Sequence, residues 1–149
     1  MYFEDFNPGD QFVSEPAVFT EEDIIDFAKR FDPQPFHVDP TAAAASIYGG
    51  LIASGWHIMA ATFGSAVRLG LFAEGGQGAP GLELVRWMKP VRPGDSLHLR
   101  ITAEDKWASS TRGDRGYVML YFEIINQRDE VVGDYRCREI YLLRNPDHS

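Results

Sequence analysis

Four strand-like runs occupy the second half of the chain, and they restrict the fold more than any other feature. The runs are rich in β-branched and aromatic residues, which strands favour. Short turn sequences such as RPGD and NQRDE separate them. The four runs cover residues 81–91, 96–108, 116–126 and 131–143. Strands that follow one another through short turns predict an antiparallel sheet.

The first half has the pattern of helices. Thr20 precedes three acidic residues, which is typical of an N-cap followed by a first helical turn. Apolar residues at helical spacing carry this helix to about Phe31, and Pro33 ends it. Asp39 and Pro40 predict the cap and first position of a second short helix. A short strand is expected before these helices, within residues 12–19.

Residues 51–73 form an apolar run nearly as long as a membrane span. The run contains His57 and Arg68 together with several small residues, so a buried helix of a folded core is the favoured interpretation. Ser54 is expected to cap this helix, which begins near Gly55. Six of its residues cover more than one face, as a helix wrapped by a sheet requires: Trp56, Ile58, Met59, Phe63, Val67 and Leu71. Helices followed by strands predict one α+β domain over residues 1–149, with a long helix wrapped by an antiparallel sheet.

Composition excludes several classes of function. A formal net charge of −8 argues against nucleic-acid binding, which needs a basic surface. Cys137 is the only cysteine, and no His, Cys, Asp and Glu spacing suggests a metal site. The N-terminal residues lack the basic start and apolar core of a signal peptide, so we expect a cytoplasmic protein without a membrane anchor.

The segment RFDPQPFHVDP, residues 30–40, combines prolines with groups that exchange protons. Asp32 and His37 lie five residues apart. Pro33 and Pro35 are expected to keep the segment between the two prolines extended or turned. A carboxylate and an imidazole that converge on one water would form a general acid/base pair. The alternative from spacing alone is structural, with Asp32 capping a turn and His37 serving as a local donor.

Three segments in this order, FDPQPFHVDP, GGLIASGWH and VRWMKPVRPGD, resemble the MaoC-like dehydratases, which include the (R)-specific enoyl-CoA hydratases. The resemblance implies a hotdog fold. It also implies an acyl thioester of coenzyme A or acyl carrier protein as the substrate, a role in fatty acid metabolism, and a homodimer or a dimer of dimers.

The resemblance also implies roles for individual residues. Asp32 and His37 match the pair that activates water, and Gly55 matches the glycine whose N–H holds the thioester oxygen. A free N–H at a helix start suits a developing negative charge. Ser54 and His57 are candidate substrate-binding residues, with a structural role as the alternative for His57. The chain departs from the family at three positions: Gln34 replaces an asparagine, Ser54 a histidine and Phe63 a serine.

The sequence thus predicts a hydro-lyase that reversibly hydrates a 2-enoyl thioester to a 3-hydroxyacyl thioester. No metal or redox cofactor is expected, because the thioester itself acidifies the α-carbon. Two alternatives remain. One is a hotdog thioesterase, and the other is a non-catalytic acyl-thioester binding protein.

Overall fold

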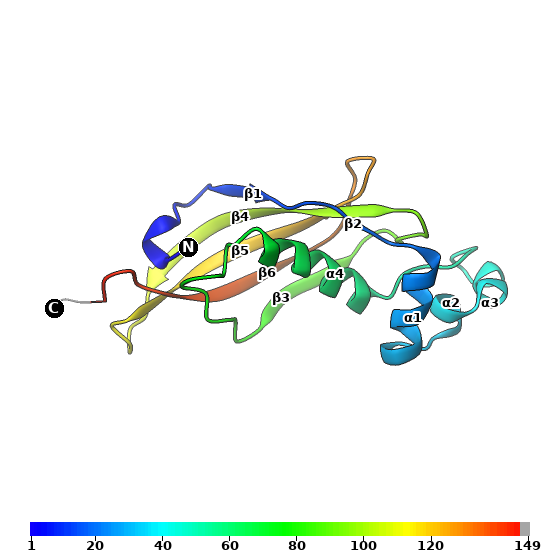
Figure 1. Ribbon diagram of the computed structural model, residues 1–149, viewed down its shortest axis with the longest axis horizontal. Helices are drawn as coiled ribbons and strands as arrows, with labels where there is room; N and C mark the ends of the chain where they lie inside the picture. Colours follow the sequence, from blue (N-terminus) through cyan, green and yellow to red (C-terminus); the bar gives the residue numbers. More distant parts are fainter. Residues whose placement is uncertain (147–149) are drawn as a thin grey trace.

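The computed structural model of the protein describes residues 1–146, and its central feature is one antiparallel sheet with a helix lying across it (Figure 1). The strand order is β1-β4-β5-β6-β3, and β2 also pairs with β4. The α+β architecture predicted from the sequence is therefore confirmed. The strands are β1 (Gln11–Val13), β2 (Ala17–Val18), β3 (Leu82–Trp87), β4 (Ser96–Ala108), β5 (Arg115–Ile125) and β6 (Val131–Leu142).

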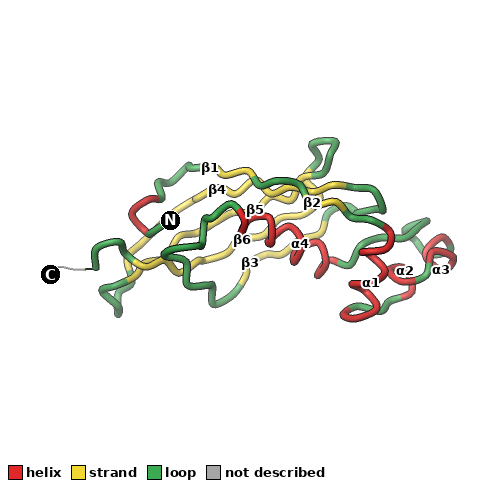
Figure 2. The backbone as a smooth tube through the Cα atoms, viewed as in Figure 1, coloured by secondary structure: helices red, strands yellow, loops and turns green. Residues whose placement is uncertain are grey.

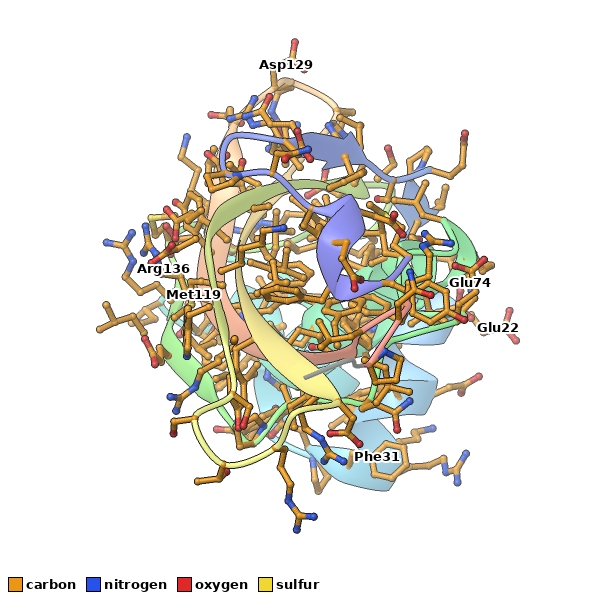
Figure 3. The ribbon with its side chains drawn as sticks, turned by 90° about the vertical axis from the view of Figure 1, so that its left-hand side faces the viewer. Glu22, Phe31, Glu74, Met119, Asp129 and Arg136 are labelled. Atoms are coloured by element: carbon orange, nitrogen blue, oxygen red, sulfur yellow. The ribbon has the colours of Figure 1, made fainter. Side chains whose placement is uncertain are left out.

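The two faces of the sheet differ because side chains alternate along each strand. On the inner face, Phe122 of β5 stacks on Tyr135 of β6 with ring centroids 4.5 Å apart. Met119 and Arg136 lie on the outer face, away from the packed interior (Figure 3). Arg136 forms an ion pair with Glu104 there at 2.7 Å. The inner face carries the core, whereas the outer face presents polar and charged side chains to solvent.

Short helices gather beyond one end of the sheet (Figure 2). They are α1 (Glu21–Phe31), α2 (Pro35–Val38) and α3 (Pro40–Ala44), and a 3₁₀ helix, η1 (Phe3–Asp5), lies near the other end. Thr20 caps α1 and Asp39 caps α3, as predicted. Gln34, between Pro33 and Pro35, has the extended backbone that was predicted, and Pro35 then begins α2, a helix that the sequence analysis did not predict. Proline favours the first helical position because its φ angle is already helical and its missing N–H is not needed there.

Helix α4 (Gly55–Arg68) crosses the inner face of the sheet and ends earlier than the apolar run suggested. Its buried face consists of Ile58, Thr62, Ser65 and Ala66. The expectation that the sheet of one chain covers several faces of this helix was wrong. Trp56 is 63% exposed and Val67 is 48% exposed, because one sheet covers only one side of a helix.

Residues 75–78, beyond α4, run alongside the end of β6. The Gln77 N–H donates to the Ile140 carbonyl at 2.8 Å, and the Leu142 N–H donates to the Gly75 carbonyl at 2.8 Å. These bonds tie the chain to the sheet before β3 begins. Within residues 1–146, no helix has both the length and the apolar character needed to cross a membrane.

Candidate active site

The loop after α1 brings Asp32 and His37 together. Asp32 is the C-cap of α1, and its N–H donates to the Ala28 carbonyl at 2.8 Å. Pro35 then starts α2, which carries His37 on its inner side. The two side chains meet with His37 Nε2 3.2 Å from Asp32 Oδ2. The end of α1 and the start of α2 at Pro35, joined through Pro33 and Gln34, thus hold a carboxylate and an imidazole in one place.

His37 is only 4% exposed, and its ring is oriented by a backbone group. Its Nδ1 lies 2.7 Å from the carbonyl oxygen of Ile52. A carbonyl only accepts hydrogen bonds, so Nδ1 carries a hydrogen in this arrangement. Nε2, which faces Asp32, is therefore the ring atom at which a proton is gained or lost.

The Asp32 carboxylate receives hydrogen bonds at both oxygens. The Gln34 amide donates to Oδ1 at 2.8 Å, and the Ser54 hydroxyl donates to Oδ2 at 2.7 Å. Burial alone would raise the pKa of Asp32. The hydrogen bonds from Ser54 and Gln34, with the nearby His37, outweigh burial and hold this pKa below its usual value. Asp32 is thus an ionised acceptor at neutral pH.

Gly55 begins α4 beside this pair. Its N–H makes no hydrogen bond to any group within residues 1–146, as expected for the first residue of a helix. The indole of Trp87 covers the Cα of Gly55. A Cβ at this position would lie 2.5 Å from Cε2 of Trp87, closer than real side chains approach. The packing of Trp87 therefore requires glycine here.

These groups open into a cavity of about 490 Å³. Asp32, His37 and Gly55 all line it. The rest of the wall is mainly apolar and aromatic, with Phe36, Tyr48, Ile52, Trp56, Ile58 and Trp87 among its residues. A concave, mostly apolar space with a few converging polar groups is typical of a small-molecule site.

The two candidate substrate-binding residues lie elsewhere. Ser54 is fully buried and does not line the cavity; it contacts Asp32 and caps α4. His57 does not line the cavity and stacks on Phe27 of α1 with ring centroids 4.7 Å apart. Burial lowers the pKa of His57, although Asp23 partly opposes this. Its Nδ1 is buried and has no partner within residues 1–146.

Basic residues near the cavity already have acceptors. Arg86 forms a two-pronged ion pair with Asp134, at 2.8 and 2.6 Å, and Lys89 pairs with Glu130. Arg92 donates to the carbonyls of Tyr48 at 2.5 Å and Gly50 at 3.2 Å. Arg92 thereby fixes the turn that presents Tyr48 to the cavity. Over residues 1–146, no cluster of three His, Cys, Asp or Glu residues is arranged to hold a metal ion.

Sequence reasoning missed Trp87 and Arg92 as residues that shape the site. Trp87, which contacts Gly55, follows an irregular register in β3 between Glu83 and Arg86, where Leu84 has a φ of 50°. No local pattern signals such a bulge. Gln34 was noted as a departure from the family pattern, and its amide does reach Asp32.

Comparisons with known proteins identify the family of the chain. The family model described as a MaoC-like domain matches residues 5–118. The chain is 33% identical over 116 residues to Protein MaoC of Klebsiella aerogenes, a match that covers 74% of this chain and 33% of that protein. The chain thus spans about a third of the length of this relative.

Solved structures with the same fold include a MaoC-like dehydratase and an (R)-hydratase. The MaoC-like dehydratase from Rhodospirillum rubrum has a TM-score of 0.90 and 41% identity, with 97% of this chain and 98% of that chain covered. The (R)-hydratase PhaJ1 from Pseudomonas aeruginosa has a TM-score of 0.76 and 24% identity, with 95% and 85% covered. The architecture is the hotdog fold.

Proposed function

Because this chain belongs to the MaoC-like domain family, we propose that it reversibly adds water to a 2-enoyl thioester to give a 3-hydroxyacyl thioester. The observation that carries the proposal is the pairing of Asp32 with His37 in a cavity that the start of α4 also lines. The resemblance between the chain and a MaoC-like dehydratase of known structure supports the same reaction class.

In this mechanism a water molecule in the cavity contacts both the Asp32 carboxylate and His37 Nε2, which lie 3.2 Å apart. The water oxygen attacks the β-carbon of the enoyl thioester while its proton passes to Nε2, which is free to accept because Nδ1 carries the ring hydrogen. The ionised Asp32 stabilises the resulting imidazolium. The imidazolium then returns a proton to the α-carbon, so atoms and charge balance.

Negative charge develops on the thioester oxygen during the attack. Gly55 lines the cavity and its N–H has no hydrogen-bond partner within residues 1–146, so we assign this N–H to the thioester oxygen. One such donor typically lowers a barrier by about 3 kcal/mol. The proposed reaction needs no metal or redox cofactor, because the thioester carbonyl delocalises the electrons that leave the double bond.

The substrate and assembly complete the proposal. We assign the acyl group to a thioester of coenzyme A or acyl carrier protein, in a cytoplasmic enzyme of fatty acid metabolism. We also propose a homodimer or a dimer of dimers. The exposed apolar side chains of α4 and β3, which include Trp56, Val67 and Leu84, support an assembly that covers them.

The reaction is tested with enoyl thioesters of graded acyl length. Hydration removes the absorbance of the conjugated enoyl thioester and releases no thiol. A thioesterase would release thiol, and a non-catalytic binding protein would give neither signal. Loss of the enoyl absorbance without thiol is the expected result, and either of the other outcomes would replace the hydratase with the corresponding alternative.

A further inference from the structure

Ser54 links Asp32 to the start of α4 through a single oxygen atom. Its hydroxyl donates to Asp32 Oδ2 at 2.7 Å and accepts from the Trp56 N–H at 3.2 Å. The residue is fully buried and does not line the cavity. A helix cap needs only the accepting half of this arrangement. The donating half goes to the carboxylate of the proposed water-activating pair.

Thr20 shows what a cap does without that second contact. Its hydroxyl accepts from the Asp23 N–H at 3.1 Å at the start of α1, in the same way that Ser54 accepts at α4. Asp32 lies at the opposite end of α1. The two caps therefore differ in whether they contact the carboxylate.

The hydrogen bond from Ser54 also affects whether His37 has to donate to Asp32. Asp32 Oδ2 faces the Ser54 hydroxyl and His37 Nε2, while Oδ1 faces the Gln34 amide. His37 is the charged or titratable group that faces Asp32 from the elements packed against it. Without Ser54, a protonated His37 would be the donor left for Oδ2 among residues 1–146. Nε2 would then be held in an ion pair and could not take a proton from water.

We propose that Ser54 is a positioning residue, whose hydroxyl fixes the Asp32 carboxylate relative to the Gly55 N–H and leaves His37 Nε2 free for the water. The role rests on the proposed hydration, but it acts through Asp32 and involves no contact with substrate. Because this buried hydroxyl donates one hydrogen bond and accepts another, it joins the carboxylate and the helix start in a single rigid unit. The pKa of Asp32, which Ser54 helps to lower, is consistent with this role.

Ser54→Ala and Ser54→Thr test the proposal, with Thr20→Ala as the matched loss of a helix cap. Ser54→Ala is expected to reduce kcat about tenfold or more, as loss of a hydrogen bond to a charged group does. KM should change little, because no substrate contact is removed. The acid limb of the pH–rate profile should move to higher pH, and Ser54→Thr should restore both properties. Thr20→Ala should lower Tm and leave the profile in place.

A second measurement does not depend on turnover. Titration of the Asp32 carboxyl carbon by NMR should show a higher pKa in Ser54→Ala than in the wild-type protein. If Ser54→Ala does not fold, Ser54→Gly gives the same comparison, since glycine is tolerated at an N-cap better than alanine. An unchanged titration and an unchanged acid limb, with a fall in Tm like that of Thr20→Ala, would overturn the proposal. If the wild-type protein hydrates no enoyl thioester, the proposed function fails, and the titration alone decides the role of Ser54.

Discussion

Asp32 and Glu139 are carboxyl groups whose surroundings move their pKa values in opposite directions. Asp32 receives hydrogen bonds from Ser54 and Gln34, so its pKa is lowered despite burial. Glu139 is only 4% exposed on the inner side of β6, and burial raises its pKa. The Cys137 thiol, which donates at 3.3 Å, and the Gly78 backbone oppose this only in part. The first carboxyl is placed to remain charged, whereas the second resists ionisation.

Glu139→Gln should make stability less dependent on pH. A raised pKa in the folded state means that ionisation costs more there than in the unfolded chain, so stability falls as the pH rises from roughly 4 through the folded pKa. We expect the variant to melt roughly 2–4 °C above the wild-type protein at pH 8, as about 1 kcal/mol would produce. The difference should vanish near pH 4. Thermal unfolding across this range tests it, with the exposed Glu15→Gln as control; a constant difference at every pH would contradict the argument.

Gly55→Ala should destabilise the protein through Trp87. The added Cβ would lie 2.5 Å from the indole, so the ring or the helix must move. Overpacking of this kind typically costs about 1–3 kcal/mol. Trp87→Ala in the same chain removes the clash, so the double variant should show a smaller loss than the sum of the two single variants. Additive losses of Tm would show that the two residues are not coupled.

At the scale of elements, the long strands and capped helices were predictable, and the irregular connections were not. The prediction for β4 matches residue for residue, because apolar and polar residues alternate between clear turns. Helix α2 was missed because proline restricts the residue before it but leaves the conformation after Pro35 open. The spacing of Asp32 and His37 indicated a pair. Ser54, which contacts Asp32, and Ile52, which contacts His37, are distant in the sequence, and only the folded structure brings them close to the pair.

Substitution of Arg92 tests whether its side chain holds the turn at Tyr48 and Gly50 beside the cavity. Its guanidinium donates to the carbonyls of Tyr48 and Gly50, which the variant Arg92→Ala would leave without that donor. We expect Tm to fall by several degrees and KM to rise more than kcat falls, because Tyr48 lines the cavity but lies outside the reacting pair. Arg112→Ala, in the exposed turn between β4 and β5, is the control. Equal behaviour of the two variants would refute the role of Arg92.

The whole molecule leaves an apolar surface uncovered. Strand β3 is an edge of the sheet, and Leu84 on it is 73% exposed. Exposed apolar side chains of α4 accompany this edge, and soluble proteins rarely leave such combinations open. A second copy of the chain would cover both features, which is the physical reason for the proposed dimer.

Light scattering at micromolar concentration should give twice the mass of one chain or a multiple of it. Val67→Lys places a charge on the exposed face of α4 and should shift the protein toward monomer. Val13→Lys is the matched control, because Val13 is 58% exposed on β1 at the other edge of the sheet. A wild-type monomer, or equal effects of the two substitutions, would exclude an assembly through α4 and β3.

The central claim is that Asp32 and His37 act together on one water, and a double-mutant comparison of hydration rates tests it most directly. Asp32→Asn and His37→Ala are assayed for loss of enoyl absorbance, singly and together, and each variant is melted in parallel. We predict that each single variant loses more than about a hundredfold in rate, and that the double variant is barely slower, because residues that act as one unit do not contribute additively. Rates within about tenfold of the wild-type protein, or about 1.4 kcal/mol of barrier, together with a fall in Tm, would contradict the account and show that the pair only stabilises its loop.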